Sequence, residues 1–132
     1  MSREFYWLAA TVALTGLIWI PYMLDRAAVR GLMGVFANPV PNAARQSEWA
    51  ERMIVGHRNA VENLVVFAPL VLMLGALDIS TQTTVIACQT FFGARLAHLV
   101  LLTVGVVILR TLAFLVGFGA QAVLLLVLFG FM

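Results

Sequence analysis

The fold is decided by residues 51–63, which read ERMIVGHRNAVEN and lead directly into an apolar run over residues 64–77. At 3.6 residues per turn, four polar side chains fall within about one quadrant of a helix: Arg52, Asn59, Glu62 and Asn63. Carboxylate and carboxamide groups that enter a bilayer are unfavourable unless they face protein, water or a ligand. The pattern therefore indicates a membrane-spanning helix that begins with a polar site.

A simpler interpretation of the same segment is a salt-bridged helix start. Arg58 and Glu62 are four residues apart, and such a pair can interact along one face of a helix. Spacing alone does not separate a ligand site from this local ion pair, and both interpretations stay open at this point.

The composition predicts an integral membrane protein. Of the 132 residues, 63% are hydrophobic and 11% are charged, and the mean hydropathy is +1.02. A soluble domain of this size cannot bury so much apolar surface. The apolar runs are continuous rather than alternating, which favours helices over a membrane β-barrel. The net charge of +2 is small and dispersed, so a nucleic-acid partner is not expected. The single cysteine, Cys88, excludes an internal disulfide.

We predict one domain over residues 1–132 with four spans, at residues 5–24, 57–77, 83–103 and 108–131. A loop over residues 25–56 joins the first two spans. Residues 96–132 carry one charge, Arg110, and Gly105 is the break that precedes it. A single helix of this length would be about 55 Å long, which exceeds one bilayer crossing. The expected fold is therefore an all-α four-helix bundle.

The long loop indicates the orientation. Pro39 and Pro41 cannot continue a helix, so we expect a turn there, with Asn42 capping the helix that follows. Five of the eight arginines lie in or beside the loop, and positive loops face the cytoplasm. Both termini then lie on the non-cytoplasmic side. The expected location is a membrane crossed several times, which is the inner or plasma membrane if the chain is bacterial.

With this topology, six polar side chains from three spans lie toward the cytoplasmic side of the bundle: Arg52, Asn59, Glu62, Arg95, His98 and Arg110. Convergence at one depth is what a site for an anionic polar ligand requires. The alternative is a set of interhelical ion pairs and of arginines that extend to lipid phosphates. The arginines outnumber the one carboxylate, which favours an anionic ligand or lipid headgroup. Two histidines and one cysteine on different spans do not make a metal site.

Three segments resemble the MAPEG family, the membrane-associated proteins in eicosanoid and glutathione metabolism. Residues 51–62 resemble the family's second-helix signature, residues 94–98 its third-helix signature, and Arg110-Thr111 the start of its fourth helix. The loop pieces at residues 29–30 and 36–39 are similar as well. The resemblance covers most of the chain and is closest to microsomal glutathione transferase and microsomal prostaglandin E synthase.

The resemblance implies a homotrimer of four-helix bundles that binds glutathione at each subunit interface. It assigns the tripeptide to Asn59 and Glu62, with its carboxylates held near Arg30, Arg52, Arg58, Arg95 and His98. It places Arg110 beside the thiol, as the catalytic residue. A guanidinium near a thiol favours the reactive thiolate, which would attack a lipophilic electrophile, or reduce a lipid peroxide, arriving from the bilayer.

Two positions depart from the family pattern. The second-helix signature usually has another arginine where this chain has Val55, and the third-helix signature usually ends in a tyrosine where this chain has Leu102. The tyrosine hydroxyl is a donor to the thiol in the family, and leucine cannot donate. The resemblance implies a glutathione-dependent transferase or peroxidase. The alternative is an impaired MAPEG-fold protein that serves as a structural or lipid-binding subunit of a larger membrane complex. A small transporter ranks last, because the broken-helix repeats of such proteins are absent.

Overall fold

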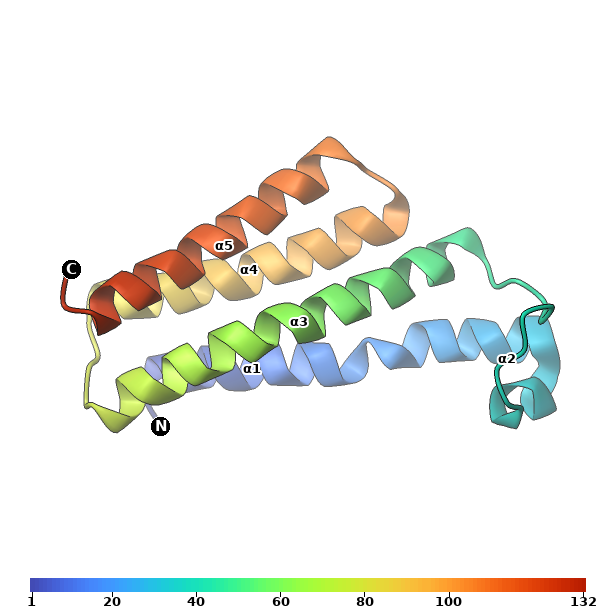
Figure 1. The fold of residues 1–132 in the computed structure, drawn as a ribbon, viewed down its shortest axis with the longest axis horizontal. Helices are drawn as coiled ribbons and strands as arrows, with labels where there is room; N and C mark the ends of the chain where they lie inside the picture. The colour runs from blue at the N-terminus through green and yellow to red at the C-terminus, as the bar shows by residue number, and fades with distance from the viewer.

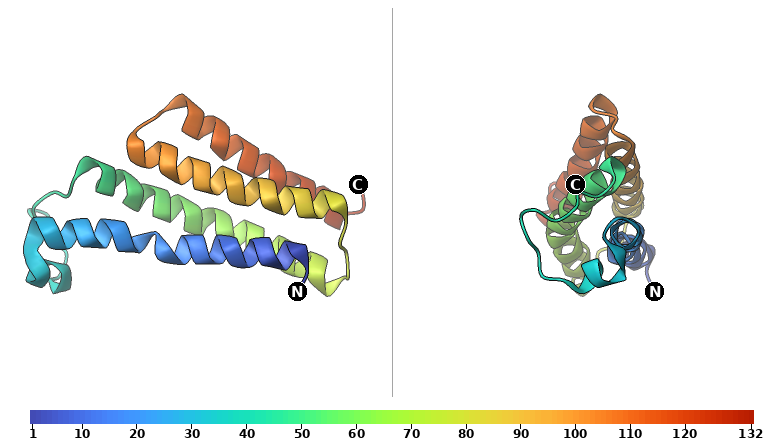
Figure 2. Two further views of the ribbon diagram at one scale, coloured as in Figure 1. Left: turned by 180° about the vertical axis from the view of Figure 1, so that it is seen from behind. Right: turned by 90° about the vertical axis from the view of Figure 1, so that its right-hand side faces the viewer.

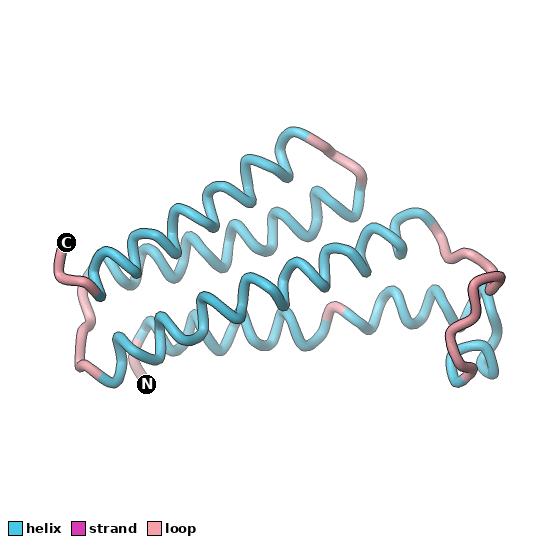
Figure 3. Tube along the Cα trace, viewed as in Figure 1, coloured by secondary structure: helices cyan, strands magenta, loops and turns pink.

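The computed structural model describes all residues, 1–132, as a bundle of helices without strands. Figure 1 shows the five helical segments lying roughly along one long axis. Both termini and the α3–α4 turn lie at one end of the molecule, and the α2–α3 loop lies at the other (Figures 1 and 3). Four helices are long and apolar enough to cross a membrane. The predicted all-α membrane bundle is confirmed.

The first membrane helix consists of α1, Arg3–Leu17, and α2, Trp19–Phe36, which follow each other with one residue between them. Ser2 caps α1, because its hydroxyl accepts a hydrogen bond from the backbone N–H of Phe5 at 3.1 Å. The interruption, Ile18, lies three residues before Pro21, which lacks the N–H that would bond the preceding turn. Together α1 and α2 make a 34-residue unit, longer than the predicted span.

The long loop is shorter than predicted. Helix α2 extends to Phe36, and α3, Glu48–Ala76, begins after eleven intervening residues. The expected cap at Asn42 is wrong: Ser47 occupies the N-cap position of α3, and the carboxylate of Asp25 accepts hydrogen bonds from its backbone N–H and its hydroxyl. An aspartate from α2 therefore holds the N-cap residue of α3 in place, a contact that local spacing in the sequence does not predict. Helix α3 continues through Pro69.

Helix α4, Gln82–Val104, is the central helix and packs against α1, α3 and α5. Thr81 and Thr84 form a capping box at its start. It ends at Gly105, whose φ of +90° is a left-handed conformation that favours glycine, and α5, Ile108–Leu128, follows. The predicted break at Gly105 is confirmed, and one long helix over residues 96–132 is excluded.

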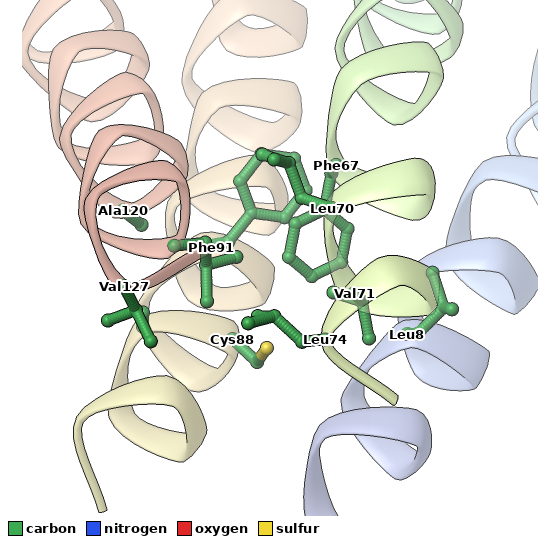
Figure 4. Packing of buried hydrophobic residues seen from close by; sticks show 11 residues of the cluster. Leu8, Phe67, Leu70, Val71, Leu74, Cys88, Phe91, Ala120 and Val127 are labelled. Carbon is green, nitrogen blue, oxygen red and sulfur yellow. The ribbon is translucent and has the colours of Figure 1, made fainter. Parts of the chain in front are cut away.

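The apolar core lies toward the end of the bundle that carries the termini. Phe67 of α3 and Phe91 of α4 stack with their ring centroids 3.9 Å apart, and Leu74, Leu124 and Cys88 are fully buried around them. Figure 4 shows these side chains filling the space between the helices. Because this half of the bundle is filled by carbon, the charged side chains of α3 and α4 lie in the other half.

Candidate functional site

Arg95 of α4 is the most buried arginine of the chain, with 4% of its surface exposed. Its Nη1 donates a hydrogen bond of 2.9 Å to Oδ1 of Asn59 on α3. Its Nε and Nη2 are also buried and have no partner. The only ion pair in the chain involves other residues. Arg95 is therefore a buried cation without a carboxylate, a costly arrangement inside a protein.

Two aromatic rings and a glycine surround the guanidinium group of Arg95. Its central carbon lies 5.8 Å from the ring centroid of Phe91 and 5.2 Å from that of Phe114, within the range of cation–π attraction. Gly117 of α5 faces the same group, and a Cβ at that position would lie 3.2 Å from both Nε and Nη2. The missing side chain of Gly117 thus leaves room for the arginine.

A short series of hydrogen bonds links α3, α4 and α5 at the level of Arg95. Asn63 Nδ2 donates to the backbone oxygen of Asn59 at 2.8 Å, and Gln121 Nε2 of α5 donates to the backbone oxygen of Asn63 at 3.0 Å. The sequence analysis did not assign a role to Gln121. A signal was present, since Gln121 is the only polar side chain between Thr111 and the C-terminus.

His98 and Arg110 lie on the same side of the bundle as Arg95. His98 is buried, its ring lies 6.1 Å from that of Phe114, and it is close enough to feel the charges of both Arg95 and Arg110. Arg110 is half-buried in the first turn of α5. Its side chain has no hydrogen-bond acceptor and no carboxylate partner in the chain. The structure thus brings Arg95, Asn59, His98 and Arg110 together.

Four other predicted site residues lie outside this cluster. Arg58 and Glu62 are exposed on α3 and form no ion pair with each other, so the local pair that their spacing suggested is not formed. Arg52 donates from Nε to the carbonyl of Thr103 at 2.9 Å and pairs with Glu48 at 3.7 Å.

The Arg52 bond satisfies one of the free carbonyls at the end of α4, where a positive charge is favourable. Arg30, the fourth of these residues, donates from Nε to the carbonyl of Ala44 at 2.6 Å, within the α2–α3 loop.

Two hydrogen-bonded groups at the loop end were not expected from sequence. Tyr22 and His57 are joined by a 2.7 Å hydrogen bond between the phenol oxygen and Nδ1. Gln46 is buried and donates to the carbonyl of Tyr22 and to the carboxylate of Asp25. These contacts join α2 to the start of α3 across more than twenty residues of sequence, a separation at which spacing patterns carry no information.

The two departures from the family pattern have different surroundings. Val55 is exposed on α3. Leu102 is buried, and its methyl carbon lies 3.3 Å from the point where a Cβ on Gly56 would be. Leu102 is therefore a packing residue between α4 and α3.

The chain was compared with known proteins and structures. It matches the model of the MAPEG family over residues 5–130. No curated protein and no solved structure matches it.

Proposed function

The chain belongs to the MAPEG family, and from this membership and the buried Arg95 cluster we propose that it binds glutathione and uses it as a transferase or peroxidase on lipophilic substrates. The match covers nearly the whole chain, so the family assignment extends to all four membrane helices. The observation that supports the proposal most directly is the buried guanidinium of Arg95, with two nitrogens that have no partner in the chain.

The residues present fit an anionic tripeptide. Glutathione carries carboxylates, and a guanidinium group forms paired hydrogen bonds with a carboxylate through its fixed fork of donors. Arg95 has one side of that fork engaged by Asn59 and the other side free. A carboxylate at the free side would supply the countercharge that the bundle itself lacks. We therefore assign Arg95 and Asn59 to ligand binding, with His98 lining the same region.

When bound, glutathione supplies a thiol that becomes a strong nucleophile in its thiolate form. Arg110 is the residue we assign to that thiol. Its guanidinium has no carboxylate partner in the chain, so its full positive charge is available to stabilise a neighbouring anion. His98 is buried in the same region, and we assign it to the lining of the site.

One chain does not complete the proposed site. Arg58 and Glu62 interrupt an exposed apolar stripe on α3 that includes Val55, Val65 and Leu72. Charged side chains facing lipid are unfavourable, so we propose that a neighbouring copy covers this stripe in a homotrimer. In that assembly Arg58 and Glu62 would hold the outer part of the tripeptide, and each cavity would lie between two subunits.

Calorimetric titration of the detergent-solubilised protein with glutathione tests the proposal. We expect saturable binding by the wild type, its loss in Arg95→Leu, and unchanged binding in Arg45→Gln, an exposed loop variant. Absence of binding at millimolar glutathione, or equal binding by wild type and Arg95→Leu, would contradict it. A further assay with a lipophilic electrophile in the same detergent should show turnover that Arg110→Ala loses.

Leu102 supports a second candidate function. Its burial against Gly56 places a packing side chain where the family usually has a hydroxyl donor, which favours a non-catalytic subunit of a larger membrane complex. This candidate predicts glutathione or lipid binding without turnover, and co-purification of a second membrane protein in mild detergent. Purification that always yields a bare trimer with turnover would exclude it.

A further inference from the structure

The end of α2 departs from the direction of the bundle. Gly31 has φ of +74° and ψ of +169°, a backbone conformation open to glycine that interrupts the helix. After it, residues 32–36 form a short helical turn. Figures 1 and 2 show this turn running across the long axis of the molecule rather than along it.

This turn and the adjoining loop expose large apolar side chains. Met33 is 78% exposed, Phe36 74%, Leu32 68% and Val40 54%. Each of these residues therefore has more than half of its surface outside the protein. An apolar group of this kind at the end of a membrane protein marks an interaction surface.

The height of the turn can be estimated from helix geometry. Glu4 of α1 and Thr84 of α4 lie at one level, because they share a hydrogen bond of 2.6 Å. From residue 4 to residue 31 the helix rises by about 40 Å, and from Thr84 to the end of α4 it rises by about 30 Å. The turn therefore lies about 10 Å beyond the end of α4. Taking the end of α4 as the boundary of the hydrocarbon core, the turn lies at the outer edge of the headgroup layer, which is about 5–8 Å thick on each side of the core.

The charges of the segment match an anionic surface. Residues 26–45 contain three arginines and no acidic residue. Arg26 and Arg30 line a cavity of about 490 Å³ that has no acidic residue in its wall. The Nε of Arg26 donates a hydrogen bond to Oε1 of Gln46, and the Nε of Arg30 donates to the carbonyl oxygen of Ala44. Neither arginine has an ion-pair partner. Their terminal amino groups are free to bind phosphate.

We propose that residues 31–40 form an interfacial anchor that lies in the headgroup layer of an anionic membrane. Leu32, Met33 and Phe36 reach into the headgroup layer, and Arg26 and Arg30 face lipid phosphates. Apolar side chains beside arginines are the combination that holds in-plane helices at a membrane surface. The anchor is independent of the glutathione site, and it would fix the height of the α2–α3 loop relative to the bilayer.

Spin labels test the depth of this segment in vesicles of phosphatidylcholine and phosphatidylglycerol. Labels are placed by Met33→Cys and Phe36→Cys, with Asn42→Cys as the control on the exposed part of the same loop. The wild type serves as the blank, since its only cysteine, Cys88, is fully buried. Power saturation then compares accessibility to oxygen, which enters lipid, with accessibility to a nickel chelate, which stays in water.

We expect labels at positions 33 and 36 to be accessible to oxygen and protected from nickel, and the label at 42 to be accessible to nickel. Nickel access at 33 and 36 equal to that at 42 would overturn the proposal, because the segment would then lie in water. Protection from both reagents would also overturn it, since a second protein copy would then cover the patch. Arg26→Gln should raise nickel access at 36 at least twofold in anionic vesicles and leave it unchanged in neutral ones. Equal access in both would refute the phosphate contact.

Discussion

At the scale of single residues, the central feature is a cation held where cations are unfavourable. Arg95 is 4% exposed, and Asn59 is its only hydrogen-bond acceptor. The aromatic rings of Phe91 and Phe114 offset part of the penalty. The bundle therefore carries a local instability that a bound carboxylate would relieve.

The first prediction follows from this instability. Arg95→Leu should raise the free energy of unfolding of the ligand-free protein by about 1–4 kcal/mol, because replacing a buried charge by an apolar group of similar size removes a desolvation penalty. The same variant should lose the stabilisation that glutathione gives the wild type. Thermal unfolding in detergent, with and without glutathione, measures both effects. A strong loss of stability in the ligand-free variant would mean that Arg95 is a structural residue.

Gly117 provides a test that leaves Arg95 in place. Gly117→Ala adds a methyl group 3.2 Å from Nε and Nη2 of Arg95, so the guanidinium must shift. We expect glutathione affinity to fall about tenfold, equivalent to about 1.4 kcal/mol. Gly119→Ala is the matched control, since a Cβ there meets nothing within 4 Å. Equal affinities for the two variants would show that the position of Arg95 is irrelevant to binding.

At the scale of helices, local sequence signals predicted the four membrane-spanning helices and several of their ends. The break at Gly105 followed from one glycine in an apolar run, and its left-handed φ explains why that glycine ends α4. The extent of α2 and the start of α3 could not be predicted in this way. They depend on Asp25, which binds Ser47 across the loop, and such a contact leaves no periodic pattern in the sequence.

The start of α4 gives a prediction at this scale. Thr84 completes the capping box with Thr81 and donates to the carboxylate of Glu4 on α1. Thr84→Val should lower the free energy of unfolding by about 1–3 kcal/mol, because it removes a cap and a hydrogen bond to a charged group. Thr83→Val, at the exposed neighbouring position, should change it by less than about 0.5 kcal/mol. Denaturant unfolding of both variants is the measurement, and equal stabilities would contradict this account of the α1–α4 contact.

At the scale of the whole molecule, the proposed glutathione site needs residues that one chain does not bring together. The sequence predicted that six polar side chains converge, because residues near facing helix ends lie at one depth. The structure brings Arg95, Asn59, His98 and Arg110 to one region, but Arg52 bonds to the end of α4 and Glu62 is exposed. The sequence did not predict that Arg58 and Glu62 point outward from α3. Buried and exposed positions of α3 lie within one turn of each other. Which of them are buried depends on how α3 packs against α4, and the sequence alone does not fix that packing.

The proposed trimer gives a prediction at this scale, and the exposed charges on α3 are where we place its interface. The mass of the solubilised protein, corrected for detergent, should be three times 14.4 kDa. Arg58→Glu should reduce the trimer fraction, because it places two carboxylates four residues apart on the proposed interface. Arg45→Glu, in the loop, should leave the trimer intact. Light scattering of both variants tests this, and an intact Arg58→Glu trimer would place the interface elsewhere.

The most direct test of the glutathione site is a density map of the assembled protein with glutathione, examined at the free Nε and Nη2 of Arg95. The account predicts a tripeptide carboxylate within hydrogen-bond distance of that guanidinium, with the thiol toward Arg110. A lipid chain at this position, or a carboxylate from a neighbouring subunit paired with Arg95, would contradict it.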